Sequence, residues 1–149
     1  MRNYYIYNMI EKTVIELTYD QAMTYDELEY LEINVEDDHN DGGVVTTDNE
    51  FGYIVVDAAT PEYVKLVLDH EIGHLVTGYR REDGGWHHGS EVEADAHAAE
   101  VNGLDRVLTL LHDTCGQIEA LPDDSWKTTA LKQLRQRIRK LKHVFKYKK

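Results

Sequence analysis

The feature that most constrains this chain is a pair of histidines separated by three residues, with a glutamate directly after the first. They are His70, Glu71 and His74, in the run His-Glu-Ile-Gly-His. In a helix, residues four apart lie one above the other on the same face, so both imidazoles can reach one metal ion. Glu71 then lies beside the ion's open coordination position, where a carboxylate can accept a proton from bound water. The pattern predicts a metal-binding helix and favours hydrolytic chemistry.

Local signals predict the helix that this motif requires. Thr60 is a typical N-cap and Pro61 suits the first helical position, so we expect a helix over 61–79. Apolar residues occur on both sides of this helix, which is typical of a buried helix. Tyr79 falls on the apolar stripe, so core packing is the favoured role for its side chain, with an oxyanion hydrogen bond as the alternative. We therefore expect the two histidines in a cleft or interior.

A carboxylate on the next predicted helix, 90–103, is the expected third ligand. Ser90 and Glu93 fit a capping box, in which each side chain bonds the other's backbone amide. That role occupies Glu93 and favours Glu91 as the ligand, with Glu93 or a histidine as alternatives. Asp95 lies one turn beyond Glu91, where its carboxylate can accept the outer N–H of a ligand imidazole. The expected cofactor is one Zn²⁺ per chain, bound by His70, His74 and Glu91.

Three further histidines lie near the motif in sequence. His87 and His88 fall in the polar segment 80–89, where solvent exposure is the ordinary expectation and contact with a substrate or oxyanion is the functional one. His97 lies six residues after Glu91, and a partly buried structural role is favoured over ligation or substrate contact. The single cysteine, Cys115, means that His, Asp and Glu must supply any metal site.

Length and composition favour one globular domain. The chain has 149 residues, 42% of them apolar, and no stretch approaches the roughly 20 continuous apolar residues of a membrane helix. The first residues lack a signal-peptide pattern, and the lone cysteine fits a reducing compartment, so we expect a cytoplasmic protein. The expected domain, 1–149, comprises an N-terminal helix and sheet over 1–60, two metal-site helices over 61–103 and C-terminal helices over 104–149, the last of them basic.

Charge is divided sharply along the chain. Residues 127–149 carry ten of the 16 basic residues and no acidic residue, whereas residues 1–126 carry all 28 acidic residues. A basic tail of this kind can attract nucleic acid. It can equally pack against the acidic body of its own chain, and we favour this second interpretation because it needs no outside partner.

The order of the predicted elements indicates an α+β fold. The segment 4–18 is ambiguous between strand and helix, because its crowded Tyr and Ile residues suit a pleated surface. The run 33–35 alternates like a strand. The architecture that we expect is a small sheet packed against the metal-binding helix, with further helices C-terminal to it. The other predicted elements are an acidic helix over 20–31, a hairpin of strands 44–47 and 51–56, and helices over 104–120 and 126–145.

Three runs together suggest a family. They are Gly52-Tyr-Ile-Val-Val-Asp57, Leu68-Asp-His-Glu-Ile-Gly-His-Leu-Val-Thr-Gly78 and Ser90-Glu-Val-Glu-Ala-Asp-Ala-His-Ala-Ala99. Residues 28–102, which contain them, resemble the ImmA/IrrE family of small zinc peptidases, common in bacteria, prophages and other mobile elements. Matched by position, the resemblance implies that His70, His74 and Glu91 bind zinc, that Glu71 is the general base, and that Asp95 supports a ligand.

The resemblance also implies a minimal gluzincin-like fold and the activity of a cytoplasmic zinc endopeptidase. Family members typically cut or inactivate a helix-turn-helix repressor encoded nearby, so a protein substrate of this kind is implied. The sequence departs from the family pattern at His97, where a large apolar residue is usual, and in the basic C-terminal helix. An alternative function is a non-catalytic regulator, stabilised by zinc, that binds a repressor or nucleic acid through residues 127–149.

Overall fold

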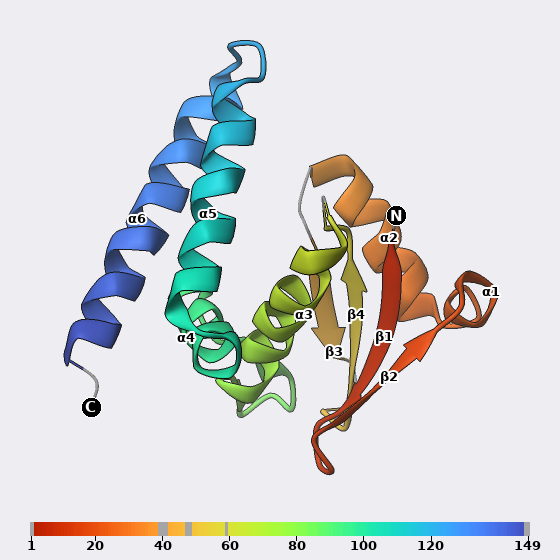
Figure 1. Ribbon diagram of the computed structural model, residues 1–149. Helices are drawn as coiled ribbons and strands as arrows, with labels where there is room; N and C mark the ends of the chain where they lie inside the picture. The colour runs from red at the N-terminus through yellow and green to blue at the C-terminus, as the bar shows by residue number, and fades with distance from the viewer. Residues whose placement is uncertain (1, 39–41, 47–48, 59, 148–149) are drawn as a thin grey trace.

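The computed structural model of the chain describes residues 2–38, 42–46, 49–58 and 60–147. Within these residues, a four-stranded antiparallel sheet and a small second hairpin combine with six helices, which confirms the α+β prediction (Figure 1). None of the described helices has both the length and the apolar character that a membrane span requires. The elements are β1 (Asn3–Asn8), β2 (Thr13–Leu17), α1 (Tyr19–Ala22), α2 (Asp26–Asp38), β3 (Gly42–Thr46), β4 (Phe51–Val56), α3 (Pro61–Val76), β5 (Tyr79–Arg80), β6 (Trp86–His87), α4 (Glu91–Asn102), α5 (Leu104–Glu119) and α6 (Ser125–Tyr147).

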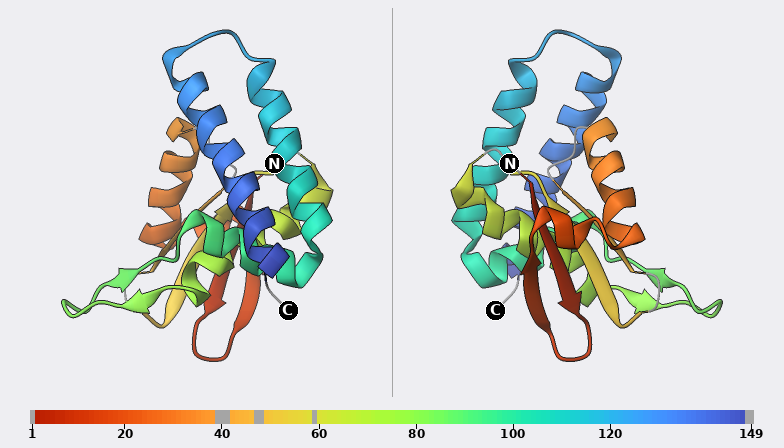
Figure 2. Two further views of the ribbon diagram at one scale, coloured as in Figure 1. Left: turned by 90° about the vertical axis from the view of Figure 1, so that its left-hand side faces the viewer. Right: turned by 90° about the vertical axis from the view of Figure 1, so that its right-hand side faces the viewer.

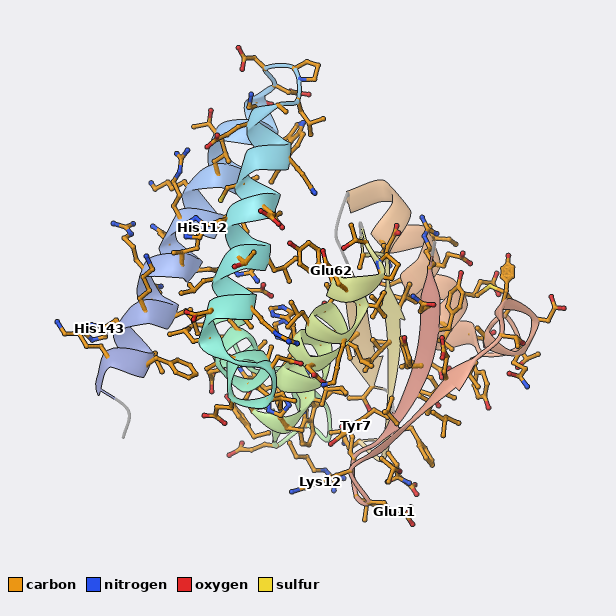
Figure 3. The ribbon with its side chains drawn as sticks, in the orientation of Figure 1. Tyr7, Glu11, Lys12, Glu62, His112 and His143 are labelled. Carbon is orange, nitrogen blue, oxygen red and sulfur yellow. The ribbon has the colours of Figure 1, made fainter. Side chains whose placement is uncertain are left out.

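The larger sheet has the strand order β2-β1-β4-β3, so β3 is an edge strand. The ambiguous opening segment forms the hairpin of β1 and β2, whose turn, with Glu11 and Lys12, points away from the C-terminal helices (Figure 3). The predicted hairpin of strands 44–47 and 51–56 is confirmed as β3 and β4, in which Val44 pairs with Ile54. Residues 47 and 48 of that prediction lie outside the described residues.

The strand predicted at 33–35 is wrong, because these residues belong to α2. Leu28, Leu31 and Val35 are buried, and their spacing of three and then four residues is helical. Ile33 falls between them on the outer face and is 56% exposed. The alternation of Ile33, Asn34 and Val35 is thus a short-range coincidence inside a longer helical pattern.

The two helices α2 and α3 cover opposite faces of the sheet (Figure 1). Successive side chains of a strand point to opposite faces, so β1 and β4 supply both cores. The face under α2 is formed by Tyr4, Ile6, Tyr53 and Val55. The face under α3 is formed by Tyr5, Tyr7, Ile54 and Val56. Helix α3, which carries His70 and His74, therefore lies on the most buried pair of strands.

Helix α3 begins as predicted but ends earlier. Thr60 occupies the N-cap position with Pro61 behind it, although its hydroxyl makes no capping bond. The helix ends at Val76, and Tyr79 instead pairs with His87 in the hairpin of β5 and β6. The prediction of core packing for Tyr79 is therefore wrong: the residue is 59% exposed, and its ring stacks on His87 with ring centroids 4.6 Å apart. The predicted polar segment 80–89 contains all of this hairpin except Tyr79.

The C-terminal helices α5 and α6 form an antiparallel hairpin that packs on α4 (Figure 2). Their predicted ranges are confirmed within two residues at each end. Four residues of the apolar seam of α6 are buried in the same core as Leu66 of α3, whereas Trp126 at its start is 38% exposed. The buried seam residues are Leu131, Leu134, Ile138 and Leu141. The basic helix thus packs against its own chain, as favoured from its charge.

Candidate metal centre

Two helices bring the three predicted ligands together. His70 and His74 project from one face of α3, and Glu91 is the first residue of α4. The two Nε2 atoms lie 3.2 Å apart. The Glu91 carboxylate places Oε1 2.9 Å from Nε2 of His74 and Oε2 3.5 Å from Nε2 of His70. These three residues form a group whose ligand atoms all lie within 4.8 Å of one another.

The spacing of these atoms fits a small divalent ion. A tetrahedral zinc ion with bonds of about 2.0–2.1 Å holds its ligand atoms about 3.3 Å apart. Nε2 of His74 lies 3.2 Å from Nε2 of His70 and 2.9 Å from Oε1 of Glu91, both close to that value, and the other Glu91 oxygen lies 3.5 Å from Nε2 of His70. Among the described residues, no fourth His, Cys, Asp or Glu joins the group. Three protein ligands with a further open position are typical of catalytic zinc, whereas structural zinc usually has four.

Hydrogen bonds at the outer ring nitrogens orient both imidazoles. Nδ1 of His70 lies 2.8 Å from Oδ1 of Asp95, and Nδ1 of His74 lies 2.6 Å from the carbonyl oxygen of Gly89. An ionised carboxylate and a carbonyl oxygen only accept, so each Nδ1 donates. Each ring thus directs Nε2, the atom that would bind an ion, toward the Glu91 carboxylate. Two unprotonated Nε2 atoms and a carboxylate that face one another require a cation or protons between them. A metal ion fits this set of ligand atoms.

The same convergence of polar groups shifts the pKa values of the three candidate ligands. Burial by itself lowers the pKa of His70, but hydrogen bonds to Asp95 and Glu91 overcome this effect and raise it to about 10. Burial likewise opposes protonation of His74, and the bond to Glu91 raises its pKa. Burial would raise the pKa of Glu91, yet the two histidines hold it well below the usual range. The cluster therefore favours positive charge at its centre.

The capping box predicted at the start of α4 is confirmed. The Ser90 hydroxyl accepts from the backbone amide of Glu93, and the Glu93 carboxylate accepts from the backbone amide of Ser90. Both distances are 3.1 Å. This occupies Glu93 and leaves the half-exposed side chain of Glu91 directed at the histidines. The choice of Glu91 over Glu93 thus rests on a local hydrogen-bond pattern that the sequence already contained.

Glu71 lies beside the cluster but outside it. Its side chain is buried, and burial raises the pKa of its carboxyl group, although the charges of His70 and His74 lower it. None of the described residues makes a hydrogen bond to this carboxylate. It lines the same groove as His70, His74 and Glu91. A buried carboxylate next to three convergent candidate ligands can accept a proton.

The crossing of α3 and α4 is close because Gly73 lies between the two histidines. A Cβ atom at Gly73 would lie 2.8 Å from Cα and 2.9 Å from the carbonyl oxygen of Ala94. Both of these are backbone atoms that cannot move aside without shifting α4. The missing side chain therefore sets the separation between the helix with the histidines and the helix with Glu91.

Arg137 of α6 is a site residue that the sequence did not reveal. Its guanidinium group donates from Nε to Oδ2 and from Nη2 to Oδ1 of Asp95, at 2.9 and 2.8 Å. Burial would raise the pKa of Asp95, but the hydrogen bonds of His70 and Arg137 hold it low. One signal was present: Arg137 lies three residues after Leu134 and four before Leu141, at the edge of the buried seam of α6.

Of the remaining candidate residues, which are Tyr79, His87, His88 and His97, the structure places only His88 in the groove. His88 is half-buried and lines the groove, and burial lowers its pKa. His87 is exposed against Tyr79, and neither of these two residues lines the groove. His97 is partly buried at the crossing of α3 and α4, in agreement with a structural role. Two histidines on the C-terminal hairpin, His112 and His143, lie outside the cluster (Figure 3).

The cluster opens into a groove of about 1460 Å³. One side is formed by β3 and α3, and the other by α5 and α6. Comparisons with known protein families, curated proteins and solved structures find no match to this chain. His70, His74 and Glu91 could hold a metal ion beside a buried carboxylate, and all four side chains line this groove.

Proposed function

We propose that this protein is a zinc-dependent endopeptidase similar to the ImmA/IrrE family, with His70, His74 and Glu91 as the residues that hold the ion. The observation that carries this proposal is the position of Glu71, a buried carboxylate next to three convergent donor groups. When bound at such a site, zinc polarises the scissile carbonyl and lowers the pKa of its bound water toward about 7.

Glu71 has the role of general base in this proposal. Its burial raises its pKa, so it accepts a proton more readily than an exposed carboxylate. It takes the proton of the attacking water and then delivers it to the leaving amine. Asp95 and the Gly89 carbonyl hold the two imidazole rings in place through Nδ1 while this happens.

The groove supports a polypeptide as the substrate. Its volume of about 1460 Å³ exceeds the roughly 300–1,000 Å³ of most small-molecule sites. Gly42 and Val44 of the edge strand β3 line it next to Glu71. An extended peptide that pairs with such an edge strand passes the cluster along its length. The resemblance to the family further suggests a helix-turn-helix repressor of a phage or mobile element as the natural target.

The direct test is the substitution Glu71→Gln, which keeps the size of the side chain and removes the base. We expect zinc to remain bound while turnover falls by about 10²–10⁴-fold, the usual contribution of general acid–base catalysis. The assay is digestion of a proteome-derived peptide library by the zinc-loaded protein, with new termini identified by mass spectrometry. Chelator-treated protein is the control.

Equal cleavage by the wild-type protein and Glu71→Gln would refute this mechanism. Co-expression with a repressor encoded nearby, followed by mass spectrometry of its fragments, tests the proposed target.

The alternative is a regulator without catalysis, in which zinc only stabilises the fold. The exposed basic residues of α6, which include Lys132 and Arg139, are the observation that favours it. The three-ligand cluster favours the peptidase, because structural sites usually have four protein ligands. Binding of a labelled DNA duplex by Glu71→Gln protein, without any cleavage by the wild-type protein, would support the alternative.

A further inference from the structure

The contact between α6 and the candidate metal centre involves one cation and two carboxylates. The planar guanidinium of Arg137 binds both oxygens of Asp95, at 2.8 and 2.9 Å, and its Nη1 lies 3.4 Å from Oε2 of Glu91. Asp95 is 1% exposed, and the Arg137 side chain is 23% exposed. The basic C-terminal helix therefore reaches a candidate ligand directly and a second one, His70, through Asp95.

We propose that Arg137 is a positioning residue of the metal centre, which fixes His70 through Asp95 and restrains Glu91 from the C-terminal helix. This inference rests on the proposed metal site. Oδ1 of Asp95 accepts from both Arg137 and His70, so the orientation of the carboxylate determines that of the imidazole ring. A two-bond fork holds a carboxylate plane in one orientation, which a single ammonium group does not do.

Charge balance supports the same role. Glu71, Glu91 and Asp95 place three carboxylates around the cluster, and within the described residues Arg137 is the one Lys or Arg that forms an ion pair with any of them. The positive charges of a divalent ion and one guanidinium balance the negative charges of three ionised carboxylates. A buried Asp95 without Arg137 would keep an uncompensated charge, which is costly in a protein interior.

Arg137 also restrains Glu91 by competing for one of its oxygens. Nη1 of Arg137 approaches Oε2, whereas Oε1 is the oxygen nearer to His74. Because Glu91 is half-exposed, few other contacts limit its rotation. Removal of Arg137 should therefore make the side chains of both Glu91 and His70 more mobile. This should change the affinity and coordination geometry of a metal ion even if no substrate is present.

The experiment compares Arg137→Gln and Arg137→Lys with Arg135→Gln as a matched control. Arg135 lies on the same helix and forms an exposed ion pair with Glu119 at 2.8 Å, whereas Arg137 pairs with Asp95 and Glu91. Zinc affinity is measured by competition with a chromogenic chelator, and the visible spectrum of the Co²⁺-loaded protein reports ligand geometry. Circular dichroism and thermal unfolding of the metal-free proteins report folding.

We expect Arg137→Gln to weaken zinc binding by about 10–100-fold, the usual effect of losing a residue that supports a ligand. The Co²⁺ spectrum should change as well. Arg137→Lys keeps the charge but not the fork, so it should fold and recover only part of the affinity. Arg135→Gln should match the wild-type protein in both measurements.

Three results would overturn the inference: wild-type affinity and spectrum in Arg137→Gln, full recovery in Arg137→Lys, or an equal loss in Arg135→Gln. If Arg137→Gln fails to fold, Arg137→Lys decides, and failure of both to fold would show a packing role instead. These outcomes are distinct from failure of the proposed function. A wild-type protein that takes up no zinc refutes the metal centre itself, whereas peptidase activity enters none of these measurements.

Discussion

At the scale of single residues, the candidate centre is defined by which atom of each side chain is already engaged. His70 and His74 each use Nδ1 for a hydrogen bond, so both present Nε2 to Glu91. The carboxylate of Asp95 is engaged on both oxygens, whereas that of Glu71 has no hydrogen-bond donor among the described residues. His70, His74 and Asp95, which orient the site, are thus held by hydrogen bonds. Glu71, the residue proposed to move a proton, has no such bond to the described residues.

The raised pKa of His70 predicts opposite effects of pH on stability and on metal binding. Its value is about 10 in the folded protein, against 6.5 for an unperturbed histidine. The protonated ring stabilises the metal-free fold fully below pH 6.5, and this contribution is lost as the pH rises toward 10. We expect the free energy of unfolding of the metal-free protein to fall across this range, as measured by urea denaturation.

Zinc affinity should rise over the same range, because metal ions compete with protons for imidazole nitrogens. Titration with zinc at several pH values measures this rise, together with the protons released. The substitution His70→Asn should remove most of the pH dependence of stability. Stability that does not change with pH in the metal-free wild-type protein would contradict the assignment of these shifts to His70.

At the scale of elements, the site depends on the distance between α3 and α4. His70 and His74 lie on one helix and Glu91 on the other, so a change in helix separation moves ligands apart. Gly73 lets the two backbones approach, because a Cβ atom at this position would lie only 2.8 Å from Cα of Ala94. The capping box of Ser90 and Glu93 then fixes where α4 begins, and with it the place of Glu91.

A matched pair of glycine substitutions tests this crossing. Ala is a better helix former than Gly by about 1 kcal/mol, so Gly116→Ala in α5, where a Cβ would meet nothing within 4 Å, should stabilise the protein. Gly73→Ala should instead destabilise it by about 1–3 kcal/mol through overpacking, and weaken zinc binding. Thermal unfolding and zinc titration of both variants check this. Stabilisation by both substitutions would show that α3 and α4 do not require the close contact.

At the scale of the whole molecule, three hydrophobic cores support the site. One of them, which also contains Leu66 of α3, includes the C-terminal helix α6. The sheet positions α3 from one side, and the α5–α6 hairpin positions α4 from the other (Figure 1). Tyr63 of α3 also donates a hydrogen bond to Asp113 of α5. Although it is rich in basic residues, α6 is therefore part of the folded body and not an appended tail.

Two adjacent residues of α6 test this conclusion. Leu141 is 0% exposed, so Leu141→Ala should lower the free energy of unfolding by about 2–5 kcal/mol. Lys142 is exposed, and Lys142→Ala should change it by less than about 0.5 kcal/mol. Urea denaturation of the two variants measures the difference. Equal effects would indicate that α6 contributes only surface charge to the protein.

Several features of the fold and the site were predictable because neighbouring residues encode them. The helical spacing of His70 and His74 placed both imidazoles on one face, and the capping box distinguished Glu91 from Glu93. The hairpin of β3 and β4 followed from two apolar runs with a polar turn between them. The errors at 33–35 and at Tyr79 arose where a short pattern fitted two structures and packing decided between them.

Residues close together in the chain were enough to place His70 and His74 on one helix face, because local helix geometry relates residues one turn apart. How the candidate ligands are held in place depends on contacts between distant segments of the chain. Arg137 lies 42 residues from Asp95, and the pairing of β1 with β4 joins segments on either side of α2. Such contacts depend on how complete helices and sheets pack. Packing involves many residues at once, so no single spacing in the sequence predicts these contacts.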